Sequence, residues 1–345
     1  MILAGLFVLT TERSLYRALP QWPFPANTAL MLKRLVPAFA LIAACQSAPA
    51  EAPAAPLEAP SVWRPVDPEN LLLFDMGEDD AGVSRTIAIE LFPEAAPANA
   101  EALRAAARTG YYDGEFFYRV VETHVAQAGK EFDQRLEGAP RVPLEAERTI
   151  GADGFDPLGS ADLYAGEVGH RKGFAVGRAG DQEWLLNCPG AVGMARDDDP
   201  DTAVAEFYIP LLPRRYLDRN YTVVGRVIDG MDVVNRLARV QPFDEEETAA
   251  LFGDDAPLAY QMAQYRRSKL DPNMIVSARV AADLPEGERP AYEVMETPSP
   301  DWESLKDSKR DYSAIAAFVV TPPHVVDICS IPTPVRTISV HTNAD

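Results

Sequence analysis

Basic residues, cysteine and long apolar runs are all scarce in this sequence, and each scarcity argues against a class of protein. The 345 residues contain 32 lysines and arginines against 52 aspartates and glutamates, which gives a formal net charge of −20. This charge argues against nucleic acid or an anionic lipid surface as an electrostatic partner. No uncharged apolar run reaches about 18 residues, so we expect no ordinary membrane-spanning helix. A lipid anchor remains compatible with the sequence, because it acts by hydrophobic burial.

Cysteine and histidine are also few. The chain has three cysteines, Cys45, Cys188 and Cys329, and four scattered histidines, and it contains no CxxC motif. No spacing typical of a structural zinc or haem site is present, and we expect neither a metal nor a cofactor. Cys188 and Cys329 could pair in an oxidising periplasm, but their spacing alone does not decide this. The 47% apolar content is sufficient for a buried core.

The N-terminal region has the features of a bacterial export signal. Lys33 and Arg34 precede an apolar run from Leu35 to Ala44, which ends in the letters IAAC at positions 42–45. These four residues resemble a bacterial lipobox, and the resemblance implies cleavage before Cys45 and lipidation of its thiol. An ordinary secretory signal and a chance apolar segment are the alternatives. We therefore expect a lipid-anchored protein on the periplasmic side of a bacterial membrane, or a secreted or periplasmic protein if the lipobox is not used.

Composition divides the chain into successive regions. An Ala/Pro-rich tract follows the signal and cannot pack a core, so we interpret it as an extended tether. The residues before Met31 fit neither signal nor linker, and we suspect Met31 as the true start. The expected regions are an N-terminal extension (1–30), a lipoprotein signal peptide (31–44), a linker (45–68), a main domain (69–240) with an inserted loop at about 150–189, and a C-terminal extension (241–345).

Apolar periodicity predicts mainly short strands in the main domain. Residues 71–75 and 85–91 read as strands, and the second alternates its apolar residues onto one face. Residues 97–108 read as a helix that begins at a proline and is followed by Gly110. A second helix is expected at 231–239. Many short strands with few helices favour an all-β barrel or sandwich.

Three sequence blocks resemble the cyclophilin family of peptidyl-prolyl cis-trans isomerases. In chain order they read IAIELFPEAAPANAEALRAAARTGYYDGEFFYRVV, GMARDDDPDTAVAEFYI and RYLDRNYTVVGRVIDGMDVVNRL. The resemblance implies a closed eight-stranded antiparallel barrel capped by two helices, with the active groove on its outer surface. It also implies rotation of X–Pro bonds in proline-containing polypeptide clients, here extracytoplasmic proteins whose folding would be assisted.

The family match assigns catalysis to Arg119 and Gln127. In the twisted transition state the proline nitrogen loses amide conjugation and becomes a better acceptor, so a guanidinium aimed at it stabilises that state preferentially. The match implies that Gln127 orients the arginine and binds substrate backbone. Strict alternation places Arg119 on the same strand face as Phe117 and opposite Tyr118. No nucleophile, metal or cofactor is required.

The expected proline pocket departs from the family pattern. His124 and Val125 replace an aromatic residue and a methionine, and Glu206 replaces a glutamine near the arginine. The second pocket aromatic, usually phenylalanine in the family, is Tyr208. Alternation predicts that Glu206 points outward with Tyr208, while Phe207 and Ile209 point into the barrel. The substrate-binding positions carried over from the family are His124, Val125, Ala195, Arg196, Glu206, Tyr208, Tyr216, Leu217 and Tyr221.

Two functions are compatible with these residues. Retention of Arg119 and Gln127 favours an active prolyl isomerase. The substitutions at Glu206, His124 and Val125 favour a catalytically weak module that binds prolyl segments or acts as a chaperone. We also expect Glu206 to restrain Arg119, so that Glu206→Gln would raise activity.

Overall fold

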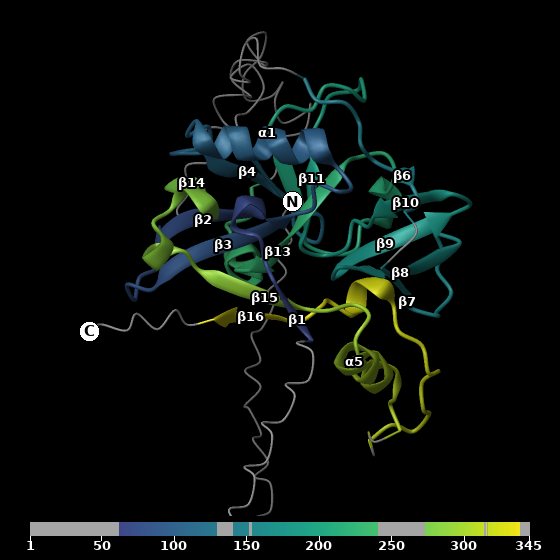
Figure 1. Ribbon diagram of the computed structural model, residues 1–345. Coiled ribbons are helices and arrows are strands. Elements are labelled where there is room, and N and C mark those ends of the chain that lie inside the picture. Colours follow the sequence, from purple (N-terminus) through teal and green to yellow (C-terminus); the bar gives the residue numbers. More distant parts are fainter. Residues whose placement is uncertain are drawn as a thin grey trace, which may run out of the picture. The chain divides into compact units, whose positions relative to one another are not determined.

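A computed structural model describes residues 62–129, 141–151, 154–240, 273–313, 315 and 317–338. The lipobox, the signal and most of the linker lie outside these residues. The described chain is mainly β (Figure 1). No helix within the described residues combines the length and the apolar character needed to cross a membrane.

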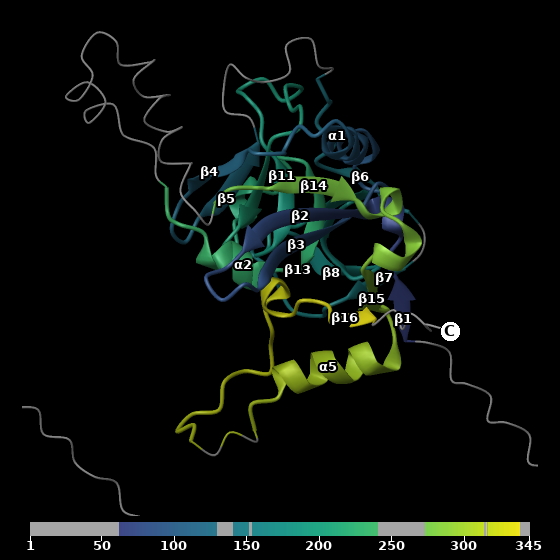
Figure 2. The same cartoon turned by 90° about the vertical axis from the view of Figure 1, so that its left-hand side faces the viewer.

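The main sheet has eight strands in the order β14-β2-β3-β13-β11-β12-β5-β4, and every neighbouring pair is antiparallel. Figure 2 shows β14, β2, β3 and β13 side by side. In chain order the strands are β2 (Leu71–Glu78), β3 (Ser84–Leu91), β4 (Phe116–Val120), β5 (Val125–Gly129), β11 (Ala191–Met194), β12 (Phe207–Pro210), β13 (Val223–Asp229) and β14 (Ser277–Val280).

The expected closure of the barrel is not confirmed. The sheet is a curled half-barrel whose ladder ends at β14 on one edge and at β4 on the other. A single antiparallel bridge between Phe116 and Met274, together with the backbone hydrogen bond from Phe117 N to the Asn273 carbonyl (3.0 Å), ties the residues just before β14 to β4. The two edges therefore meet through a short segment and not through a full strand pair.

The core lies on the concave side of this sheet. Phe207 and Ile209 are buried in it, as alternation predicted, and Phe74 and Tyr112 pack against the Phe207 ring. Helix α1 (Pro97–Arg108) forms where expected and buries its alanine-rich face, including Leu103, against the sheet. Helix α2 (Met231–Arg236) is shorter than the expected 231–239 and contacts β3.

The inserted loop expected at 150–189 is instead a second, five-stranded sheet. Its order is β6-β10-β9-β8-β7, with β6 (Arg148–Thr149), β7 (Phe155–Pro157), β8 (Glu167–Arg171), β9 (Phe174–Ala179) and β10 (Gln182–Leu185). The segment looks polar because a charged cluster is buried in it. Glu183 is almost completely buried and pairs with Arg148, Arg171 and Arg178 at 2.7–2.8 Å. Buried charges and buried apolar residues such as Val176 and Trp184 are interspersed in these short strands, which interrupts the apolar alternation that would reveal them.

The C-terminal region is not separate from the sheets. It supplies the edge strand β14, and its strands β15 (Ala291–Met295) and β16 (Val335–Ile338) pair with each other and, through β15, with β1 (Trp63–Pro65). Helix α5 (Pro300–Arg310) packs on the second sheet, where Trp302 Nε1 and Lys306 Nζ donate to the buried carboxylate of Asp156 at 2.5 and 2.8 Å. Short 3₁₀ helices complete the fold: η1 (Pro68–Asn70), η3 (Arg215–Leu217), η5 (Ala281–Asp283), η6 (Glu286–Glu288) and η7 (Ile328–Ser330).

A disulfide joins the two cysteines whose pairing the sequence left open. Cys188, just before β11, is bonded to Cys329 in η7, 141 residues further along the chain. The bond ties the C-terminal segment to the part of the main sheet that carries the candidate site.

Candidate active site

Four residues form a row across adjacent strands of the main sheet. Arg119 on β4 is directly opposite Gln127 on β5, Gln127 is opposite Tyr208 on β12, and Tyr208 is opposite Gly193 on β11. Side chains of directly opposite residues share a face and lie within contact distance. The register therefore brings together the two expected catalytic residues and the expected pocket aromatic.

Gln127 is held by contacts on both ends of its side-chain amide. Its Oε1 accepts a hydrogen bond from an Arg119 guanidinium nitrogen at 3.2 Å. Its Nε2 donates to the Tyr118 hydroxyl and to Glu206 Oε1, both at 2.6 Å. With both acceptors on the nitrogen side, the amide can present only its oxygen to Arg119. This is the contact through which Gln127 would act in the orienting role that the family resemblance implies, and that role stays a prediction.

The predicted strict alternation of side chains between the two faces of β4 is wrong. Phe117 and Val120 are both completely buried in the core, whereas Tyr118 and Arg119 both reach the vicinity of Gln127. The cause is an irregularity in the β4–β5 register between Phe116 and Arg119. A bulge of this kind adds a residue to one strand and resets which side chains face outward. Tyr118 therefore belongs to the site, although the sequence placed it on the opposite face.

Glu206 lies just before β12 and is 6% exposed. Burial raises the pKa of its carboxyl from an ordinary value of 4.5 to about 8. The side chain packs against Gly129, where an added Cβ would come within 3.1 Å of the Glu206 Cγ. At neutral pH the group is therefore mostly a neutral acid whose Oε1 accepts from Gln127, not the carboxylate that the sequence suggested.

Tyr208 lies flat against the backbone of β11. A Cβ added to Gly193 would fall 2.2 Å from the Tyr208 Cζ, so only glycine accommodates the ring there. The hydroxyl is buried and donates to Asn187 Oδ1 at 2.8 Å. Burial also raises the pKa of Tyr208 well above its usual range, which keeps the hydroxyl protonated. The Tyr221 ring meets the Tyr208 ring edge-on at 5.9 Å, and the Arg196 guanidinium lies 4.4 Å from the Tyr221 ring centre.

The remaining expected residues surround this row. His124 is half-buried, and its pKa is lowered by burial and by the positive charges of Arg119 and Arg214. Val125 is buried opposite Pro210. The backbone N–H of Ala195 donates to the Glu206 carbonyl at 2.8 Å. Tyr216 and Leu217 both lie in η3, and Tyr216 is 55% exposed.

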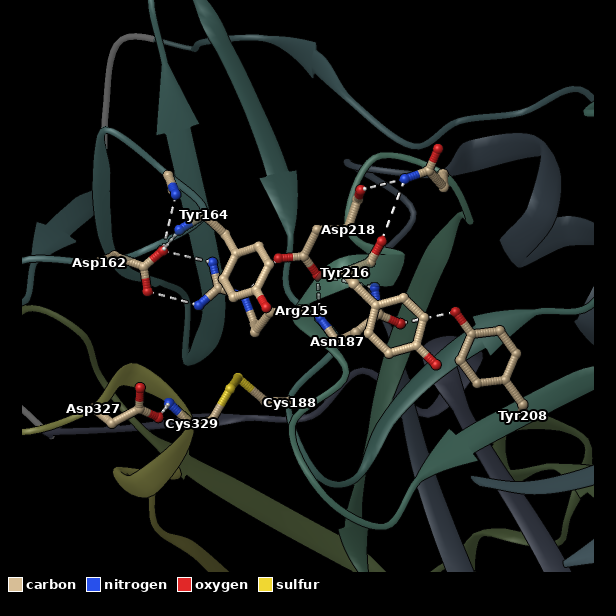
Figure 3. Close-up of polar contacts among 12 residues, drawn as sticks. Asp162, Tyr164, Asn187, Cys188, Tyr208, Arg215, Tyr216, Asp218, Asp327 and Cys329 are labelled. Carbon is tan, nitrogen blue, oxygen red and sulfur yellow. Dashed lines mark hydrogen bonds and ion pairs between the residues drawn. A yellow bond between two sulfur atoms is a disulfide. The ribbon is translucent and has the colours of Figure 1, made fainter. Parts of the chain in front are cut away.

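The polar residues behind Tyr208 were not expected from the sequence. Asn187 is buried, and the side chains of Asp218, Arg215 and Asp162 are only 5–6% exposed. Hydrogen bonds connect these residues, as Figure 3 shows. Arg215 and Asp218 lie inside a family-like block, but Asp162 belongs to the second sheet and has no motif around it. Among the described residues, no group of histidine, cysteine and acidic side chains is placed to hold a metal ion.

Comparison with known proteins identifies the family. The model for the cyclophilin-type peptidyl-prolyl cis-trans isomerases matches residues 73–257. A probable peptidyl-prolyl cis-trans isomerase of Brucella suis is 29% identical over 174 residues, which are 50% of this chain and 74% of the relative. A peptidyl-prolyl cis-trans isomerase of Schizosaccharomyces pombe is 30% identical over 155 residues, which are 45% of this chain and 80% of the relative.

A solved structure agrees with these matches. The crystal structure of cyclophilin AquaCyp293 from Hirschia baltica superposes with a TM-score of 0.59 at 26% identity, and the alignment covers 80% of this chain and 93% of that one. The chain belongs to the cyclophilin-type peptidyl-prolyl cis-trans isomerase family.

Proposed function

We propose that this protein is a catalytically active peptidyl-prolyl cis-trans isomerase acting on proline-containing polypeptides. The observation that carries the proposal is the row of Arg119, Gln127 and Tyr208 across three paired strands. A donor, the residue that orients it and an aromatic ring beside them are the parts expected of a prolyl isomerase site.

The chemistry needs little more than a positioned donor. Amide resonance gives the X–Pro bond a rotational barrier of about 18–20 kcal/mol. When the bond is twisted, the proline nitrogen regains a lone pair and can accept a hydrogen bond. Arg119 supplies that donor from a permanently charged, planar group. Gln127 fixes the direction of the guanidinium through the 3.2 Å contact, so little reorganisation is needed as the substrate twists.

A second candidate is a binding module that holds prolyl segments with little turnover. Two departures from the family pattern favour it. Glu206 occupies a buried position beside Gln127, and Tyr208 engages its hydroxyl with Asn187 instead of leaving a purely apolar ring. Both changes make the site more polar than the family pattern, which would weaken binding of a proline ring.

We further propose that the protein works outside the cytoplasm on a lipid anchor at Cys45. The Cys188–Cys329 disulfide supports an oxidising compartment, because such bonds persist there and are rare in the cytosol. The basic residues and apolar run before Cys45 support export. Its clients would then be secreted or envelope proteins.

One experiment separates the two functions. The purified protein is mixed with an X–Pro peptide, and cis–trans exchange is followed by NMR at a protein concentration far below that of the peptide. If the protein is an isomerase, a catalytic amount of it speeds exchange between the cis and trans peptide, which broadens their signals or gives exchange peaks between them. A binding module shifts peptide signals only in proportion to the protein added, with exchange remaining at the uncatalysed rate of about 10–100 s per event.

A further inference from the structure

A continuous path of buried hydrogen bonds connects Tyr208 with the second sheet. It begins at the Tyr208 hydroxyl, which donates to Asn187 Oδ1 at 2.8 Å. Asn187 is completely buried, and its backbone N–H and its Nδ2 both donate to Asp218 Oδ1, at 2.9 and 3.0 Å. The carboxylate therefore fixes which end of the Asn187 amide faces Tyr208, since only the oxygen remains for the hydroxyl.

The path continues through an arginine that joins two carboxylates. Arg215 Nε donates to Asp218 Oδ2 at 2.5 Å, and its two terminal nitrogens hold both oxygens of Asp162 at 2.8 and 3.0 Å. The three charged side chains are only 5–6% exposed. Figure 3 shows the Arg215 fork facing Asp162 on one side and Asp218 on the other.

Asp162 is itself held firmly in the segment between β7 and β8. Its Oδ1 accepts from the backbone N–H groups of Tyr164 and Ala165 at 2.8 and 2.9 Å. Burial alone would raise the pKa of this carboxyl, but the Arg215 fork and the Tyr164 N–H lower it below its ordinary value. Asp162 is therefore an ionised, rigid outer end of the path.

We propose that Asp162, Arg215 and Asn187 are positioning residues for Tyr208, so that the segment between β7 and β8 supports the proline-binding pocket from behind. This inference rests on the proposed isomerase function. The ring has one face against Gly193, and its hydroxyl is the group that the usual phenylalanine of the family lacks. An anchored hydroxyl holds the ring at one angle, and each member of the path keeps the next in the correct orientation.

The path extends further than attachment of the second sheet requires. The Arg215–Asp162 pair alone would join the two sheets, and buried ion pairs are weak contributors to stability when compared with apolar packing. Here the arginine also engages Asp218, and Asp218 sets the amide that receives the Tyr208 hydroxyl. Each polar group in the path therefore has a hydrogen-bond partner, and the last partner is Tyr208 in the candidate site.

Paired substitutions test the proposal. Asp162→Asn keeps the size of the side chain but removes its charge, and Asn187→Ala removes the acceptor of the Tyr208 hydroxyl. Each is made in the wild type and in the Y208F background, and KM and kcat for prolyl isomerisation are measured for all. Asp181→Asn, an exposed carboxylate in the same sheet, is the matched control.

In the wild-type background we expect D162N and N187A to lower kcat/KM by about threefold to tenfold, mainly through a higher KM, as loss of a buried hydrogen bond would do. In the Y208F background the same changes should alter kcat/KM less than about twofold, because no hydroxyl remains to be positioned. D181N should have no effect in either background. Equal losses in both backgrounds would refute the proposal and assign the residues to fold stability alone.

A second measurement covers variants that fold poorly and a failure of the proposed function. The flipping rate of the Tyr208 ring is measured by NMR line shape in the wild type, in D162N and in R215K, which keeps the positive charge but loses the fork that holds two carboxylates. Faster flipping in D162N supports positioning, and an unchanged rate in both variants contradicts it. If the wild type catalyses no isomerisation, the proposed function fails, while the ring measurement still decides whether the path positions Tyr208.

Discussion

Replacing Glu206 by glutamine should stabilise the protein by an amount that depends on pH. The carboxyl is 6% exposed, and burial raises its pKa from 4.5 to about 8. Below pH 4.5 the carboxyl is protonated in both the folded and the unfolded chain, so its burial costs no free energy of ionisation. As pH rises from 4.5 to 8, stability is lost, because the unfolded chain releases a proton that the folded chain retains.

The size of the effect follows from the two pKa values. Each pKa unit corresponds to 1.36 kcal/mol, so the penalty at pH 7 is about 3 kcal/mol and above pH 8 reaches about 5 kcal/mol. Glutamine keeps an acceptor for the Gln127 amide but has no proton to lose. Glu206→Gln should therefore match the wild type at pH 4.5 and exceed its free energy of unfolding by these amounts at higher pH.

Urea unfolding at pH 4.5, 7 and 9 measures this difference. Glu286→Gln, at an exposed position in η6, is the matched control for removal of a carboxylate. A stability gain for Glu206→Gln that does not change with pH would contradict the raised pKa of the Glu206 carboxyl.

Activity should follow the same titration. Below pH 8 the protonated carboxyl competes weakly for the donors around Gln127 and Arg119, so wild type and Glu206→Gln should have similar kcat/KM. Above pH 8 the carboxylate forms stronger, charge-assisted hydrogen bonds and restrains those donors. The gain expected of the glutamine variant is therefore confined to alkaline pH, and an equal gain at pH 6 would contradict this account.

Three further predictions concern other parts of the chain. Arg214→Gln should raise the pKa of His124, because burial and the positive charges of Arg119 and Arg214 lower it in the wild type. Titration of the His124 ring by NMR tests this. Arg219→Gln, at an arginine paired with Glu147, is the control and should leave the pKa of His124 unchanged. Replacing both Cys188 and Cys329 by serine should lower the free energy of unfolding by up to about 5 kcal/mol, given the 141-residue separation, and an unchanged urea midpoint would show that the bond contributes nothing. Cys45→Ala should move the protein from the membrane fraction to the soluble fraction of cells, and a soluble wild type would contradict the proposed anchor.

Much of the main sheet could be predicted from the sequence, because its signals are local. Residues 85–91 alternate apolar side chains, and 97–108 begin at a proline and bury an alanine-rich face, so strand and helix form there. Phe207 and Ile209 point inward as alternation requires. The row of Arg119 and Gln127 was reached through the family resemblance, and the register of β4 and β5 brings the two together.

The rest depends on contacts between residues that are distant in the chain. The second sheet was missed because its short strands mix buried apolar residues such as Val176 and Trp184 with the buried charge of Glu183, so no continuous apolar pattern marks them. The position of Tyr118 depends on a bulge that alternation does not encode. Asp162 reaches Arg215 across 53 residues, and no local pattern marks Asp162 as part of the site.

In the proposed mechanism the Arg119 guanidinium stabilises the twisted prolyl bond, while Gln127 holds the guanidinium in place. The most direct test compares cis–trans exchange of one X–Pro peptide by NMR with the wild type and with Arg119→Ala, while signal shifts in the same spectra report peptide binding. We expect Arg119→Ala to remain folded and still bind peptide, but to lose about a hundredfold to a thousandfold in exchange rate, as removal of one preorganised donor does in other enzymes. Wild-type exchange rates in a folded Arg119→Ala variant would contradict the mechanism.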